Sequence, residues 1–349
     1  LTIDPDTLGI SDTSELLDRA VPWIGQERAE SAAHFGLGME QADYNLFVLG
    51  EVGSGRSSLL KQAMEKVASQ RPVPPDLCYL YNFDAPERPR ALRLPAGHGR
   101  QFRQAMARML KALVTEIPRQ LDGPDYKVES ERIFKDSKER EARAFVELEA
   151  FGEARRFTMH RESGRIMFTL RDEQGHVLTD EEMLALPKEQ RVAITRAEQE
   201  LLAAINQYFE DTRAMERVAD EALAALGRQV VKPLVDRALD EVRSALLQPE
   251  EDHEKLDAYL SQVMADILDN LEVFKPSESD EEVRKEELAR VLSRYRVNLV
   301  VDNDGLQGAP VIVENNPLYR ALFGSIEYQS DNEVLVTDFS RIRVGSLHK

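Results

Sequence analysis

Hydrophobic and polar residues follow three different patterns along this chain, and each pattern predicts a different kind of structure. Over residues 1–115, short apolar runs alternate with segments of helical spacing. Over residues 116–290, the chain is rich in Glu, Arg, Ala and Leu, and apolar residues recur every three or four positions. Residues 291–349 return to short apolar runs separated by glycine-containing turns. We therefore expect an α/β domain that is interrupted by a long helical arm at residues 116–290.

The first region contains two apolar runs with a helix between them. YNLFVLG at residues 44–50 predicts a buried strand that enters a glycine turn, and the following SSLLKQAMEKVASQ has helical spacing. RPVPPD ends this helix, and LCYLYNF at residues 77–83 predicts a second buried strand. The order strand, helix, strand predicts an α/β sandwich with a parallel sheet.

The arm contains two apolar stripes with a β-rich segment before them. The first stripe, within residues 188–247, predicts an amphipathic, coiled-coil-like helix about 90 Å long, with Gly227 and Pro233 as candidate positions for a kink or break. The second stripe covers residues 256–271. Residues 156–178 carry strand-like runs split by Ser163-Gly164 and Gln174-Gly175, which predicts a small β-hairpin at the tip of the arm.

The last region contains two further strand-like runs, RVNLVVDND at residues 296–304 and APVIVENN at residues 309–316. The acidic end of the first run is also typical of the strand that supports Mg²⁺ in nucleotide sites. An ordinary strand ending in an Asp/Asn/Gly turn is the favoured interpretation.

Composition narrows the functional classes. The chain has 349 residues and 42% apolar content, enough for two or more domains, and its net charge of -18 disfavours a dedicated nucleic-acid-binding protein. Its one cysteine, Cys78, excludes an internal disulfide and fits a reducing compartment, and the six histidines show no metal-ligand spacing. Without an apolar run long enough for a membrane or a secretory signal, we expect a cytoplasmic protein.

The string GEVGSGRSS, between an apolar run and a helix, is the main candidate for chemistry. Backbone N–H groups of such a loop, together with the start of the following helix, form a site for phosphate. The residues of this candidate nucleotide-binding loop are Gly50, Gly53, Gly55, Arg56, Ser57 and Ser58.

Arg56 departs from the phosphate-loop pattern, which requires lysine after the last glycine. A guanidinium is wider and planar, so it does not replace a compact ammonium at a crowded site. We expect a degenerate loop with weak or absent ATP hydrolysis and no required cofactor, and binding of ATP or ADP stays open as an alternative. No other catalytic group stands out, and no G-x-S-x-G elbow is present.

Several ordered strings extend this interpretation. Residues 24–60, PPDLCYLYNF at 74–83, PRALRLPAGHG at 89–99, VVDNDGLQGAPVIVENNPLYRALFGSIEY at 300–328 and DFSRIRVGSLHK at 338–349 together resemble the AAA+ module of Lon-like proteases of the LonB/LonC branch. Arg56 resembles the LonC type, whose AAA+ module is degenerate and whose proteolysis does not need ATP. The resemblance implies a homo-hexameric ring that feeds polypeptide to serine peptidase domains with a Ser-Lys dyad.

In the order of this family, the chain corresponds to the N-terminal and partial AAA+ portion, before the true Walker B strand and the peptidase domain. An aromatic cluster of Tyr319, Phe323 and Tyr328 flanks Gly324. Core packing is its simplest explanation, but the resemblance places LFG at 322–324 near the pore loop, so Tyr319, Phe323 and Gly324 are candidate substrate contacts.

We therefore expect a substrate-engaging part of a Lon-like protease, with unfolded proteins as clients and without dedicated nucleic-acid or membrane partners. Whether this chain is itself an enzyme stays open, because it holds neither the dyad nor the Walker B strand. Two alternatives remain: an active ATPase motor that tolerates Arg56, and a hexamer-assembly module that contacts no client.

Overall fold

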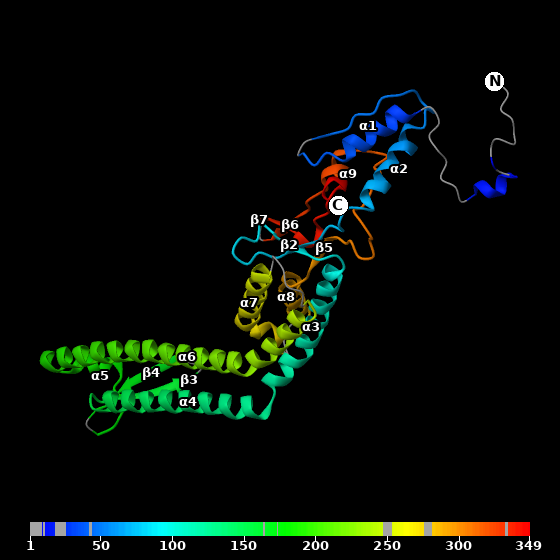
Figure 1. The fold of residues 1–349 in the computed structure, drawn as a ribbon. Coiled ribbons are helices and arrows are strands. Elements are labelled where there is room, and N and C mark those ends of the chain that lie inside the picture. The colour runs from blue at the N-terminus through cyan, green and yellow to red at the C-terminus, as the bar shows by residue number, and fades with distance from the viewer. Residues whose placement is uncertain are drawn as a thin grey trace. The chain divides into compact units, whose positions relative to one another are not determined.

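The computed structural model describes residues 9, 11–17, 26–41, 44–162, 165–172, 174–246, 253–275, 281–331 and 334–349 (Figure 1). The chain divides into two compact units. Unit 1 comprises residues 1–104, 250–252 and 296–349, and unit 2 comprises residues 105–249 and 253–295. Unit 2 is therefore an insertion in the sequence of unit 1.

Unit 1 combines short helices with small sheets. Its elements are η2 (Thr13–Leu16), α1 (Glu27–Leu37), α2 (Arg56–Ala68), β1 (Asp76–Leu80), β2 (Arg90–Leu94), the start of α3 (His98–Leu121), β5 (Asn298–Val301), α9 (Tyr319–Phe323), β6 (Tyr328–Asp331), β7 (Val334–Thr337), η4 (Phe339–Arg341) and η5 (Ser346–His348). Unit 2 is mainly helical. Its elements are the rest of α3, α4 (Pro124–Glu153), β3 (Phe157–Glu162), β4 (Arg165–Leu170), α5 (Asp180–Ala185), α6 (Lys188–Ser244), α7 (His253–Asp269), η3 (Leu271–Phe274) and α8 (Glu281–Arg294).

The main sheet of unit 1 has the order β2-β1-β5, and both of its pairings are antiparallel. The strands expected in 77–83 and 296–304 are present as β1 and β5, but the expected parallel pairing is wrong for the described strands. Strand direction was inferred from the order strand, helix, strand. In the structure β1 instead returns through a short connection to β2, which forces an antiparallel pair.

Two apolar runs that were expected to form strands do not. Residues 44–50 and 309–316 have no strand assignment, and Phe47 is 86% exposed. An extended run becomes a strand only when a neighbouring backbone accepts and donates its hydrogen bonds. Neither run forms a ladder with a described strand, although the N–H of Ala309 donates to the carbonyl oxygen of Ala68 at 2.9 Å, so apolar character alone predicted these strands wrongly.

A buried carboxylate joins the ends of the sheet to α3. Asp76, fully buried at the start of β1, accepts a hydrogen bond from the backbone N–H of Gly99 at 2.9 Å and another from that of Asn303 at 2.7 Å. The side-chain amide of Asn303 donates in turn to the carbonyl oxygens of Pro74 and Pro75. These bonds fix the start of α3 and the loop after β5 on β1.

Unit 2 contains the long helix that the apolar stripe predicts. In the arm, α4 and α6 run side by side in opposite directions, and the β3–β4 hairpin packs against α4 (Figure 1). The 57 residues of α6 correspond to about 85 Å. The helix is continuous through Gly227 and Pro233. Val231 and Val235 on either side of Pro233 are fully buried, and this packing stabilises the helix across the missing N–H.

Two groups of buried side chains stabilise unit 2. One lies between the hairpin, α4 and α6 and contains Leu148, Phe157, Met159, Leu201, Ile205 and Tyr208. The second stripe predicted from the sequence is also buried, through Leu256, Tyr259, Leu260, Val263, Ile267 and Leu271. The turn between β3 and β4, at Ser163-Gly164, lies outside the described residues.

One carboxylate on α4 is buried, although α4 is rich in charged residues of both signs. Glu141 is largely buried, and its carboxylate accepts from Lys138 at 2.9 Å and pairs with Arg161 of β3 at 2.7 Å. The hydrogen bond from Lys138, and then the one from Arg161, lower the pKa of Glu141 below its ordinary value of 4.5. The charge of Glu141 therefore stabilises the contact between α4 and the hairpin.

We predict that Asp76→Ala will destabilise unit 1 by about 2–4 kcal/mol, because two buried N–H groups lose their acceptor. The thiol of Cys78, buried in β1 with its pKa raised by burial to about 12, reports this transition when its reaction with Ellman's reagent is followed against urea concentration. Asp84→Ala is the control, since its pair with Arg90 is exposed. An equal shift in both variants would contradict the role assigned to Asp76.

We predict that acid will weaken the arm through Glu141. A lowered folded-state pKa means that its contribution is fully present above the ordinary value of 4.5 and is lost as the pH falls through the folded-state pKa. The difference in thermal midpoint between the unmodified chain and Glu141→Gln, measured by circular dichroism, should therefore shrink between pH 7 and pH 3. Glu147→Gln, at an exposed position of α4, should show little difference at any pH. If the difference in thermal midpoint between the unmodified chain and Glu141→Gln is the same at pH 7 and pH 3, this prediction is refuted.

Candidate functional site

The glycine-rich loop has the geometry of a phosphate loop at its backbone. Gly53 and Gly55 have φ angles of 85° and 76°, which favour glycine, and Gly55 directly precedes α2. Ser57 and Ser58 are exposed in the first turn of α2, where backbone N–H groups have no partner within the helix. The strand expected before the loop is absent, so the loop follows an extended, exposed segment.

The side chain of Arg56 bends back onto its own loop. Its Nη1 donates a hydrogen bond to the carbonyl oxygen of Gly50, and the Ser54 N–H donates to the carbonyl oxygen of Glu51 at 3.2 Å. The guanidinium therefore closes the loop through a contact within the protein. This contact uses one of the donors that a phosphate-binding cation would direct at its ligand.

An open hollow of about 380 Å³ lies between α1, residues 46–50 and α2. Its lining is mainly apolar, through residues such as Ala33, Leu46 and Leu59, with Ser54 and Arg56 as polar members. Below it, α1 and α2 pack through Ala33, Leu59 and Ala63. The candidate loop thus borders an apolar hollow that has one cationic side chain.

The aromatic pair, Tyr319 and Phe323, lies on the short helix α9. The two rings are 4.8 Å apart between centroids, and the residues are 75% and 50% exposed. Core packing, the simplest explanation from the sequence, therefore does not apply to these two rings. The side chain of Tyr328 lies outside the described residues.

Two glycines determine how α9 is held. Gly324 ends the helix with a φ of 87°, and a Cβ there would collide with the carbonyl oxygen of Arg343. A Cβ on Gly345 would collide with the carbonyl oxygen of Leu322. The close approach also includes the paired hydrogen bonds between Ser325 and Arg343, at 2.9 and 3.0 Å. The aromatic pair therefore stands on a backbone crossing that only glycine permits.

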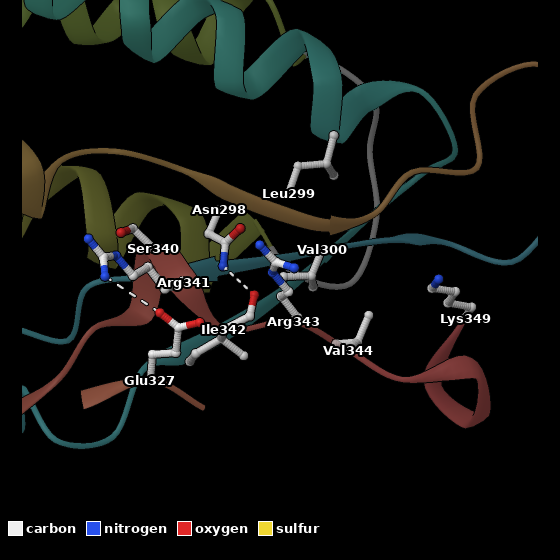
Figure 2. A pocket seen from close by; sticks show the side chains of 10 residues that line it. All are labelled: Asn298, Leu299, Val300, Glu327, Ser340, Arg341, Ile342, Arg343, Val344 and Lys349. Atoms are coloured by element: carbon white, nitrogen blue, oxygen red, sulfur yellow. Dashed lines mark hydrogen bonds and ion pairs between the residues drawn. The ribbon is translucent and has the colours of Figure 1, made fainter. Parts of the chain in front are cut away.

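A further hollow, of about 650 Å³, lies beside β5 and was not anticipated from the sequence (Figure 2). It is lined by Asn298, Leu299, Val300, Glu327, Ser340, Arg341, Ile342, Arg343, Val344 and Lys349. Its residues come from segments about 40 positions apart in the sequence. The cationic RIRV string within 338–349 was visible in the sequence, but nothing local placed it against β5.

The acidic end of β5 has a structural role. Arg100 of α3 pairs with Asp302 at 2.7 Å and with Asp304 at 2.6 Å, and Asn303 is buried against Asp76. These contacts support the ordinary strand-and-turn interpretation of residues 298–304.

Within the described part of the chain, no cluster of three or more His, Cys, Asp or Glu side chains could hold a metal ion.

Two family models match separate segments of the chain. One match begins in unit 1 and ends in the first residues of unit 2, and the other lies within unit 1. The Lon-like LonC helical domain matches residues 76–109, and the LonB-like AAA domain matches residues 307–349. These matches support a relationship between this chain and the Lon-like protease family. None of the curated proteins matches the chain. Domains of this kind suggest a role in a Lon-family protease.

The matched segments differ in what they cover. The LonB-like AAA match includes the aromatic pair and Gly324, and the LonC match includes β1, β2 and the beginning of α3. The glycine-rich loop at residues 50–58 and the whole of the arm at residues 116–290 lie outside both matches. No helix among the described residues has both the length and the apolar character needed to cross a bilayer.

Proposed function

We propose that this chain is the polypeptide-engaging part of a Lon-like protease, which captures unfolded protein and passes it to a serine peptidase chamber without hydrolysing ATP. The observation that carries this proposal is the exposed aromatic pair within the segment that matches a LonB-like AAA domain. Family membership of this kind also suggests handling of protein substrates by an oligomer, and we propose a homo-hexamer.

The aromatic pair suits contact with unfolded chains of varied sequence. Aromatic rings bury a large area with few rotatable bonds, and they contact both backbone and side chains without strict sequence requirements. Tyr319 and Phe323 are held by the glycine crossing at Gly324 and Gly345, so little order has to be gained when a client binds.

The arm offers a second surface for clients. Exposed apolar side chains on α4, β4, α5 and α6 include Val146, Met167, Leu184 and Val192. They are separate from the buried cluster of the arm, so a client can cover them without rearranging that core. We propose that the arm makes the first contact with unfolded polypeptide.

The contact between Arg56 and Gly50 supports a role without ATP hydrolysis. A hydrolytic site needs a cation that stabilises charge on the transferred phosphoryl group. In this loop the cation donates a hydrogen bond to the protein's own backbone, at the carbonyl oxygen of Gly50. We propose that the loop is a scaffold for α1 and α2, and that neither nucleotide nor metal is required.

We predict that Tyr319→Ala/Phe323→Ala will weaken binding of fluorescein-labelled casein about fivefold or more, because two exposed aromatic contacts are lost. Fluorescence anisotropy without nucleotide measures the Kd. Phe47→Ala is the control, since Phe47 is more exposed than either ring of the pair but lies outside the AAA match. Tyr319→Phe should bind almost normally.

A second variant, Met167→Ser/Leu184→Ser, tests the arm in the same assay and should weaken binding independently. If the unmodified chain shows no affinity for casein, or if Phe47→Ala weakens binding as much as the double alanine variant, the proposed role is wrong. An assembly module without client contact would give the first of these results.

We predict that Arg56→Lys will increase the affinity for Mg-ATP about tenfold or more in isothermal titration, because a compact ammonium replaces the guanidinium that closes the loop onto Gly50. Arg56→Ala is the control, which removes that contact without supplying a phosphate ligand, and its binding should stay weak. Tight ATP binding together with brisk hydrolysis by the unmodified chain would instead identify an active motor.

A further inference from the structure

A hollow lies beside β5, between this strand and residues 340–344. β5 is an edge strand, and no strand of the described part of the chain pairs on its outer side. Alternate residues of an edge strand direct their N–H and C=O groups outward. The hollow of about 650 Å³ is lined by all three of Asn298, Leu299 and Val300 of this strand and has the size of a ligand site.

Specific contacts keep residues 339–344 from closing this hollow. The side-chain amide of Asn298 donates to the carbonyl oxygens of Phe339 at 2.7 Å and of Ile342 at 3.0 Å, so a side chain stands between this segment and the backbone of β5. The backbone of Arg343 is already paired with Ser325. The segment is therefore bonded elsewhere and cannot act as the next strand.

The charge of the hollow is opposite to that of the whole chain. Arg341 is balanced by Glu327 at 3.5 Å and by Asp338 at 3.2 Å. Arg343 and Lys349 form no ion pair within the part of the chain that the structure describes. Figure 2 shows the Arg341–Glu327 pair at one side of the hollow and Lys349 at the other. The unbalanced cations thus line the same hollow as the edge strand β5, in a chain of net charge -18.

We propose that the outer edge of β5 binds an extended, acidic polypeptide segment of another chain. The segment adds a strand to the sheet through backbone hydrogen bonds, and its carboxylates pair with Arg343 and Lys349. Backbone pairing supplies affinity in this mode of recognition, and the side chains supply selectivity. Two unbalanced cations favour carboxylate-bearing partners over neutral or basic ones. This interaction stands whether or not the aromatic pair or the arm captures clients.

The test uses a fluorescein-labelled heptapeptide of alternating valine and glutamate, titrated with the full chain and followed by anisotropy. We expect saturable binding that weakens at least tenfold for a valine–lysine heptapeptide and for a valine–glutamate heptapeptide N-methylated at all seven residues. The first comparison tests charge, and the second tests backbone pairing.

Variants locate the binding site. Arg343→Glu and Lys349→Glu should each weaken binding several-fold, because both side chains are exposed and their loss leaves the Ser325–Arg343 backbone pairing intact. Arg88→Glu, an exposed arginine elsewhere in unit 1, should have no effect. Circular dichroism checks that each variant is folded.

Three outcomes would overturn the proposal. Equal binding of the lysine peptide removes the charge argument, and equal binding of the N-methylated peptide removes strand addition. If millimolar inorganic phosphate displaces the peptide while Arg343→Glu still weakens peptide binding, the hollow is a small-anion site and not a strand-binding edge. Absence of any binding by the valine–glutamate peptide also refutes it.

Discussion

A buried carboxylate holds together three parts of unit 1 that are distant in the sequence. Asp76 receives N–H groups from Gly99 and Asn303, the latter 227 residues away. Because the whole arm lies between β1 and β5 in the sequence, this contact closes unit 1 across the insertion. A charged acceptor for two buried donors is strongly favoured over leaving them without a partner. The position of β5, and with it the hollow that β5 lines, follows from this interaction.

Close backbone packing fixes the position of the aromatic pair, as Asp76 fixes the position of β5. The collisions that a Cβ would cause at Gly324 and Gly345 show that two chain segments touch without side chains between them. One consequence is that Tyr319 and Phe323 are presented to solvent on a short, fixed helix. The other is that Arg343 is held with its backbone occupied and its guanidinium free of ion pairs within the described residues. The two surfaces that we assign to polypeptide contact therefore depend on one crossing.

The glycine-rich loop combines the backbone shape of a phosphate-binding turn with a cation that contacts the loop itself. The positive φ angles of Gly53 and Gly55 and the start of α2 are those of a phosphate-binding turn. The long guanidinium of Arg56 reaches the Gly50 carbonyl, so the loop stabilises itself with the cation that would otherwise face a ligand. On this view, unit 1 engages polypeptide through apolar and cationic surfaces, and the loop contributes support.

The sequence by itself determined the elements whose signal is local. The period of apolar residues specified α6 and the buried stripe of α7, and the glycine spacing specified the turn before α2, because these depend on contacts within a few residues. Only the tertiary structure decided that β1, β2 and β5 pair antiparallel, that residues 44–50 are not a strand, and where Arg56 points. Strand partners and ion pairs form between residues that the chain brings together from far apart, and no short sequence window contains both members of such a pair.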